Sequence, residues 1–139
     1  MEQLSAPKYM LDTNICIYIR SKRPPAVLQR FRALDAGMVV MSVITFGELW
    51  YGAVKSANTK SAREALRALC EFIPVLMIPP TAGEHYGEAR ASLEKAGTVI
   101  GNNDLWIAAH ALAENLIVVT HNTNEFARIP KLVVQDWSR

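Results

Sequence analysis

Short apolar runs alternate with longer amphipathic segments along the whole chain. Apolar runs bounded by turn residues are typical of buried strands, whereas apolar positions recurring every three or four residues are typical of helices. The runs predict strands at 9–12, 38–42, 74–78, 116–120 and 132–134. The periodic segments predict helices at 13–21, 26–34, 42–56, 60–73, 81–95, 104–115 and 125–129.

Alternation of strands with helices favours a parallel sheet with helices on both of its faces. We therefore expect an α/β fold. The 139 residues contain no internal repeat, low-complexity tract or linker, so a single domain covering 1–139 is expected. Gly37 and Gly97 are expected to close the helices that precede them, because glycine adopts the left-handed conformation of a helix end.

Composition narrows the class of protein. Half of the residues are hydrophobic and 20% are charged, which is enough for a core and argues against disorder. No apolar run approaches the length of a membrane span, and residues 1–8 are too short and polar for a signal peptide. Cys16 and Cys70 lie in apolar helical contexts and suggest buried free thiols in a reducing cytoplasm. A net charge of +2 does not by itself indicate a nucleic-acid partner.

Polar residues stand at comparable places in the predicted fold. Asp12 ends the first strand, Glu48 lies in the helix after the second, and Asp104 lies in the first turn of a later helix. Asn122 follows Thr120, where the fourth strand ends. In open α/β sheets ligands bind beyond the carboxyl ends of the strands. Asp12 and Asn122 are therefore expected to converge at one edge, where helices also start.

Each of these residues also has a purely structural interpretation. Asp12 suits a helix N-cap, Asp104 suits a helix dipole, Glu48 suits an exposed helix face, and Asn122 suits a turn. The presence of all of these residues in one place is harder to explain as a contribution to the stability of the fold. Three carboxylates at a separation of ~5 Å would repel by about 3 kcal/mol per pair at an effective dielectric near 20. A bound divalent cation would offset this repulsion between the carboxylates, and oxygen ligands favour Mg²⁺ or Mn²⁺ over zinc.

Other chemistries find less support. The three histidines lack the paired spacing of a zinc helix, and neither a cysteine metal motif nor a glycine-rich phosphate loop is present. A phosphatase with an aspartate nucleophile would need a second Asp where Asn14 stands. A receiver domain would need an Asp after the third strand, and 78–80 contains none.

Several segments resemble one known family, the PIN-domain ribonuclease toxins of the VapC group in bacterial toxin–antitoxin pairs. The resemblance rests on an ordered set of blocks that spans nearly the whole chain. They are MLDTNICIYI at 10–19, SVITFGELWYGA at 42–53, IGNNDLWIAAHAL at 100–112, VTHNTNEF at 119–126 and QDW at 135–137.

The resemblance implies a PIN-like three-layer α/β/α sandwich around a short parallel sheet. It also implies a Mg²⁺- or Mn²⁺-dependent endoribonuclease, with transfer RNA as the commonest target of the family. The expected assembly is a homodimer inhibited by a VapB-type antitoxin, with DNA reached only through the antitoxin and no membrane contact. The alternative is a PIN fold without activity that binds RNA or protein; loss of the acids would be its sign, and three acids remain.

Individual positions carry over from the family. Its acidic positions fall on Asp12, Glu48 and Asp104, which are expected to be catalytic and to hold the metal. A fourth catalytic position, often Asp in PIN domains, is Asn122 here, and this departure argues against a second tightly bound metal. Further expectations concern the substrate and the partner protein. The residues expected at the substrate are Asn14, Thr120 and His121, and those expected at the antitoxin are Tyr18, Phe31, Trp50 and Tyr51.

Two groups of basic residues are candidates for following an RNA backbone, although ordinary solvated charges explain each residue equally well. One group follows the first predicted helix and the other borders the third. They comprise Arg20, Lys22 and Arg23, and Lys55, Lys60 and Arg63.

Overall fold

The computed structural model describes residues 6–138, which contain a five-stranded sheet whose paired strands are all parallel. The strand order is β3-β2-β1-β4-β5. Each predicted strand is present, in most cases shorter than expected. The strands are β1 (Tyr9–Leu11), β2 (Val39–Ser42), β3 (Val75–Leu76), β4 (Ile117–Val119) and β5 (Val134–Gln135).

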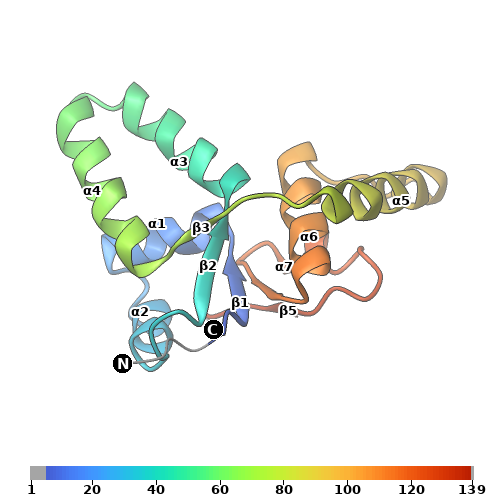
Figure 1. Ribbon diagram of the computed structural model, residues 1–139, viewed down its shortest axis with the longest axis horizontal. Coiled ribbons are helices and arrows are strands. Elements are labelled where there is room, and N and C mark those ends of the chain that lie inside the picture. Colours follow the sequence, from blue (N-terminus) through green and yellow to red (C-terminus); the bar gives the residue numbers. More distant parts are fainter. Residues whose placement is uncertain (1–5, 139) are drawn as a thin grey trace.

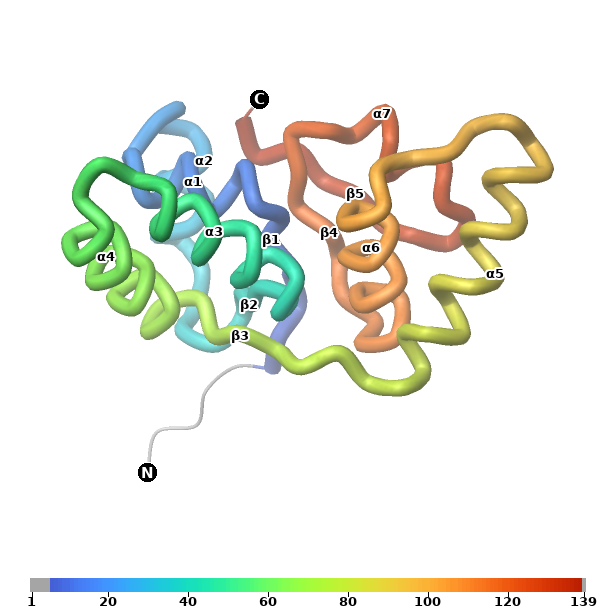
Figure 2. The backbone as a smooth tube through the Cα atoms, turned by 90° about the horizontal axis from the view of Figure 1, so that it is seen from above, coloured from blue at the N-terminus to red at the C-terminus, as the bar shows by residue number. Residues whose placement is uncertain are grey.

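Helices cover both faces of this sheet (Figure 1), and the view from above separates the two helical layers (Figure 2). The predicted three-layer α/β/α sandwich is confirmed. One layer contains α1 (Thr13–Ser21), α2 (Pro25–Arg32), α3 (Val43–Lys55) and α4 (Thr59–Phe72). The other contains α5 (Pro80–Ala96), α6 (Asn102–Glu114) and α7 (Thr123–Phe126).

The central strands carry apolar side chains to both layers, because successive residues of a strand point to opposite faces. Leu11 and Met41 belong to the hydrophobic cluster that includes residues of α1 to α4. Met10 and Val118, which pair across β1 and β4, belong to the cluster that includes residues of α5 to α7. This double burial is why 9–11 and 39–41 have continuous apolar sequences rather than alternating ones.

Three predicted boundaries were wrong. Helix α2 ends at Arg32 and is not closed by Gly37, whose φ of 91° belongs to the later turn into β2. Helix α7 covers 123–126 rather than 125–129, because Asn122 serves as its N-cap residue. Strand β5 lies at 134–135 rather than 132–134, after a turn in which Lys131 has a φ of 69°. Gly97 does close α5, with a φ of 70°.

Both cysteines are free thiols, and only one of them is fully buried as expected. Cys16 is buried and Cys70 is half-buried, and burial raises the pKa of both thiols, so both are protonated at neutral pH. Within residues 6–138, no helix has both the length and the apolar composition needed to cross a bilayer.

Candidate active site

Asp12 lies at the carboxyl end of β1 and is the N-cap residue of α1. Its Oδ1 accepts a hydrogen bond from the backbone N–H of Ile15 at 3.1 Å, and its Oδ2 accepts one from the hydroxyl of Thr120. The side chain is almost completely buried, with 4% exposure for the residue. Capping therefore uses one carboxylate oxygen, while the other faces the end of β4.

Glu48 reaches the same region from the second turn of α3. The side chain is half-buried, and its Oε1 accepts a hydrogen bond of 2.6 Å from the hydroxyl of Thr13. Thr13 immediately follows Asp12, so the start of α1 orients two acidic side chains at once. The sequence pattern did not indicate this role for Thr13, because Thr next to an N-cap suggests only a helix start.

Asp104 comes from the first turn of α6, where the resemblance and the helix pattern both place it. Its Oδ2 accepts a hydrogen bond of 3.4 Å from the side-chain amide of Asn122. The backbone N–H of Asn122 in turn donates to the hydroxyl of Thr120 at 2.9 Å. Thr120 thus joins the two ends of the site, because it accepts from Asn122 and donates to Asp12.

Burial and neighbouring acids raise the pKa values of both aspartates. Burial raises the pKa of Asp12 to about 6, against the lowering effect of Thr120 and Ile15, and the charges of Asp104 and Glu48 add to the increase. Burial also raises the pKa of Asp104, with further contributions from Glu125 and Glu48. Glu48 therefore acts electrostatically on both aspartates, and the three predicted acids share one region.

Glu125 is an acid that the sequence pattern did not single out. It lies in the first turn of α7, and its charge contributes more than that of Glu48 to the raised pKa of Asp104. A second acid three positions after Asn122 was the available signal. It suggested only a charged residue of a short helix.

The carboxylates are not arranged as a closed cation site in this structure. Among residues 6–138, no group of three or more His, Cys, Asp or Glu side chains is close enough together to hold a metal ion. The ion pairs within residues 6–138 join Arg90 with Glu94 and His121 with Asp136, and none includes these acids. The acidic charge therefore has no neutralising side chain from residues 6–138.

The residues expected at the substrate lie in different surroundings. Asn14 is exposed at the start of α1. Thr120 is fully buried, so its side chain positions Asp12 and Asn122 in this structure. His121 is exposed, and its Nδ1 lies 3.0 Å from the hydroxyl of Ser138 and 3.4 Å from a carboxylate oxygen of Asp136.

The four aromatic residues expected at a partner protein do not form one surface. Tyr18 and Phe31 are half-buried and line separate hollows, one beside His121 and one between α2 and α4. Trp50 is half-buried beneath two guanidinium groups of α4. Tyr51 is 63% exposed on α3.

Comparison with known proteins places this geometry in a family. The PIN domain model matches residues 9–132. Ribonuclease VapC1 of Haemophilus influenzae is 45% identical over 132 residues, which cover 94% of this chain and 98% of that protein. The chain belongs to the VapC group of PIN-domain proteins. The resemblance inferred from the ordered sequence blocks is thus confirmed.

Further VapC proteins agree in sequence and in fold. The tRNA(fMet)-specific endonuclease VapC of Shigella flexneri is 40% identical over 131 residues, covering 94% of this chain and 98% of that protein. A 2.2 Å structure of VapBC-1 from nontypeable Haemophilus influenzae contains a chain with 45% identity and a TM-score of 0.88. That match covers 94% of this chain and 98% of the other.

Proposed function

We propose that this VapC-group protein is the toxin of a toxin–antitoxin pair and hydrolyses phosphodiester bonds within RNA. The observation that carries the proposal is the group of acids at the carboxyl edge of the sheet. Burial and neighbouring negative charge raise the pKa values of Asp12 and Asp104, and no cationic side chain within residues 6–138 forms an ion pair with these acids. The name of the Haemophilus relative, a ribonuclease, supports RNA as the substrate. The name of the Shigella relative supports transfer RNA in particular.

Mg²⁺ or Mn²⁺ is the proposed cofactor, held by Asp12 and Asp104, with Glu48 as a direct or water-mediated ligand. The donor set fits such an ion, because it consists of carboxylate oxygens that no cationic side chain within residues 6–138 neutralises. When bound, a divalent cation polarises the phosphate and lowers the pKa of a coordinated water.

The chain's own residues orient and accept protons in this proposal. Thr120 and Thr13 each donate to one acid, which fixes the direction of the remaining carboxylate oxygens. A carboxylate oxygen of the cluster accepts a proton from the attacking water as the water oxygen bonds to phosphorus and the bond from phosphorus to the 3′-oxygen breaks. The departing 3′-oxygen takes up a proton from solvent, which leaves a 3′-hydroxyl and a 5′-phosphate. Asn122 adds an amide rather than a fourth charge beside Asp104, so it orients water or phosphate without repelling the RNA backbone.

A hollow of about 390 Å³ between α1, α3 and α4 gives RNA a path to these acids. Thr13 and Glu48 are among its lining residues, and Arg20 supplies a positive charge in the same hollow. Small residues such as Gly52 and Ala62 form much of the remaining wall. A phosphate backbone fits such a channel because the basic side chain offsets repulsion from the acids.

The first test is cleavage of transfer RNA by the purified protein with Mg²⁺, Mn²⁺ or a chelator. We expect cleavage that requires the metal, and loss of at least about a thousandfold in rate for Asp104→Asn, because one ligand and its charge are removed. Glu114→Gln, at the other end of α6, is the matched control. RNA binding without cleavage under every metal condition would favour the alternative of a non-catalytic binding module.

The proposed partner is a VapB-type antitoxin, supported by the VapBC-1 complex among the similar structures. An apolar hollow of about 560 Å³ between α2 and the end of α4 suits a segment of such a protein. Phe31 and Phe72 line this hollow, and Phe72 remains 66% exposed. Exposed aromatic surface of this kind marks interaction sites.

Co-expression with the gene encoded beside this one, followed by pull-down, tests the partner. Phe72→Ser should weaken the complex roughly tenfold or more while sparing RNA cleavage, because the side chain supports the hollow without belonging to the core. Val133→Ser, at another exposed apolar position (56% exposed), is the control. If the Phe72→Ser variant bound the partner protein as tightly as the wild type, this hollow would not be part of the interface.

A further inference from the structure

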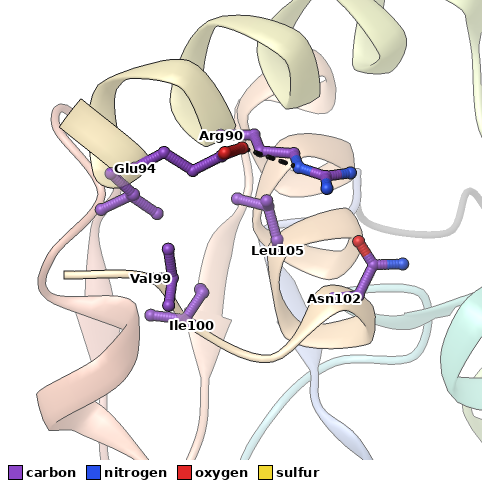
Figure 3. Close-up of a pocket in the computed structure, with 7 residues that line it drawn as sticks. Arg90, Glu94, Val99, Ile100, Asn102 and Leu105 are labelled. Atoms are coloured by element: carbon purple, nitrogen blue, oxygen red, sulfur yellow. Dashed lines mark hydrogen bonds and ion pairs between the residues drawn. The ribbon is translucent and has the colours of Figure 1, made fainter. Parts of the chain in front are cut away.

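A further hollow lies between the N-terminus of α6 and α5 (Figure 3). Its volume is about 310 Å³, at the lower end of the range for small-ligand pockets. The floor and one wall are apolar, and the remaining side chains are polar and come from two helices. The lining residues are Arg90, Leu93, Glu94, Val99, Ile100, Asn102 and Leu105.

The polar side of this hollow is held in place by a chain of hydrogen bonds. Arg90 donates from Nε to Glu94 Oε1 at 3.0 Å and from Nη1 to the Tyr86 hydroxyl at 3.0 Å. That hydroxyl donates to Oδ1 of Asn102. The ring of Tyr86 is stacked on Trp106, with centroids 3.8 Å apart and planes 10° from parallel. These hydrogen bonds connect the guanidinium, the carboxylate and the amide, although the side chains of Arg90 and Glu94 are each 56% exposed.

The hollow is next to the candidate active site along the chain and in space. Ile100 and Asn102 line it, and Gly101 between them is the N-cap residue of α6. A Cβ atom placed on Gly101 would lie 3.9 Å from Oδ2 of Asp104. One backbone residue thus separates the hollow from an acid of the proposed cleavage centre.

We propose that this hollow binds one unpaired base of the RNA, next to the scissile phosphate, and that it selects guanine. The inference rests on the proposed ribonuclease function. Sequence-specific recognition of RNA uses bases that leave the stack and present their edges to protein groups. The apolar floor suits the faces of a base, and the polar side suits its hydrogen-bonding edge.

The arrangement of donors and acceptors distinguishes guanine from the other bases. Within residues 6–138, no hydrogen bond occupies Oε2 of Glu94, Nη2 of Arg90 or Nδ2 of Asn102. Guanine carries two adjacent donors, N1–H and the 2-amino group, which match a carboxylate, and an acceptor O6 that matches a guanidinium or amide donor. Adenine, cytosine and uracil lack adjacent donors on this edge.

The experiment compares short single-stranded RNAs that differ in one base beside the mapped cleavage position. Guanine is replaced there by inosine, which lacks only the 2-amino group, or by adenine. Binding is measured by fluorescence anisotropy with the Asp104→Asn variant, and cleavage rates are measured with the wild type. We expect inosine to weaken both roughly tenfold, the effect of losing one half of a bidentate base contact.

Glu94→Gln should reduce the guanine-to-inosine ratio to near one, because the amide cannot accept both N–H groups. Glu88→Gln, on a different face of α5, should keep the wild-type ratio. Equal binding of guanine and inosine by the unsubstituted pocket, or an unchanged ratio in Glu94→Gln, would overturn the pocket proposal. A wild type that cleaves no RNA would refute the proposed function. Binding of two single-stranded RNAs that differ only in guanine or inosine at one position would then still decide for or against the base pocket.

Discussion

Among single residues, Asp12 has the most demanding surroundings. Two donors hold its oxygens, yet apolar atoms and two other acids surround it, and the pKa is raised to about 6. The hydroxyl of Thr120 offsets part of that cost and also receives the backbone N–H of Asn122. A buried threonine therefore acts on the acid from the end of a different strand.

The raised pKa predicts how the stability of the metal-free protein depends on pH. Between the ordinary value of 3.8 and about 6, folded Asp12 keeps a proton that the unfolded chain has released. The contribution of Asp12 to folding is therefore most favourable below pH 4 and declines by about 3 kcal/mol as pH rises through 6. Urea unfolding in a chelator measures this decline as the difference between the wild type and Asp12→Asn. A constant difference between pH 4 and 7 would contradict it.

The polar residues of the site were predictable to different degrees. Asp12, Glu48, Asp104 and Asn122 could be proposed from positions after apolar runs, from helix starts and from family blocks, and the structure places their side chains in one region. Thr13 was not predicted, because its bond to Glu48 joins residues of different helices. The packing of the helices and strands decides which side chains from different elements meet. A local sequence pattern does not contain that information.

Hydrophobic periodicity predicted the presence and type of the secondary structure elements correctly. The predicted ends of the elements were less accurate. The central strands and long helices were predicted because a buried strand has a continuous apolar run and a helix has a stripe. The errors lie at the end of α2, at α7 and at β5. Left-handed residues occur in two of the nearby turns, Gly37 before β2 and Lys131 before β5. Lysine is not a usual residue for that conformation, so its turn leaves no sequence signal.

Two glycines of α5 predict opposite effects of the same substitution. Gly97 has a φ of 70°, so alanine there should destabilise the protein by about 1 kcal/mol. Gly87 lies inside the helix with open space around the position of a Cβ, so alanine should stabilise it by up to about 1 kcal/mol. Thermal or urea unfolding at one protein concentration measures both variants. Effects of the same sign would contradict the assigned end of α5.

At the scale of the whole molecule, one face of α3 exposes large apolar side chains that do not contribute to the core. Val43, Tyr51 and Val54 are 38%, 63% and 45% exposed, and their spacing puts them on one face with Gly47 between them. The small glycine allows a second helix to approach closely. This face is where we propose that two copies of the chain associate.

Tyr51→Lys is therefore expected to shift the protein from dimer to monomer at micromolar concentration, because a charge enters an apolar contact. Sedimentation velocity or light scattering measures the change. Met77→Lys, at an 86% exposed position outside α3, should leave the assembly unchanged. A monomeric wild type, or a dimer that tolerates Tyr51→Lys, would exclude this face.

The order of the strands also has a consequence for synthesis of the protein. Asp12 and Glu48 precede β3, whereas Asp104 and Asn122 follow it, and β4 reaches β1 only after most of the chain has been made. A ribosome-bound chain that stops before β4 contains neither Thr120 nor Asn122, and Asp12 then lacks its hydroxyl donor. Incomplete products therefore lack part of the candidate site, and the complete set of site residues exists only near the end of translation.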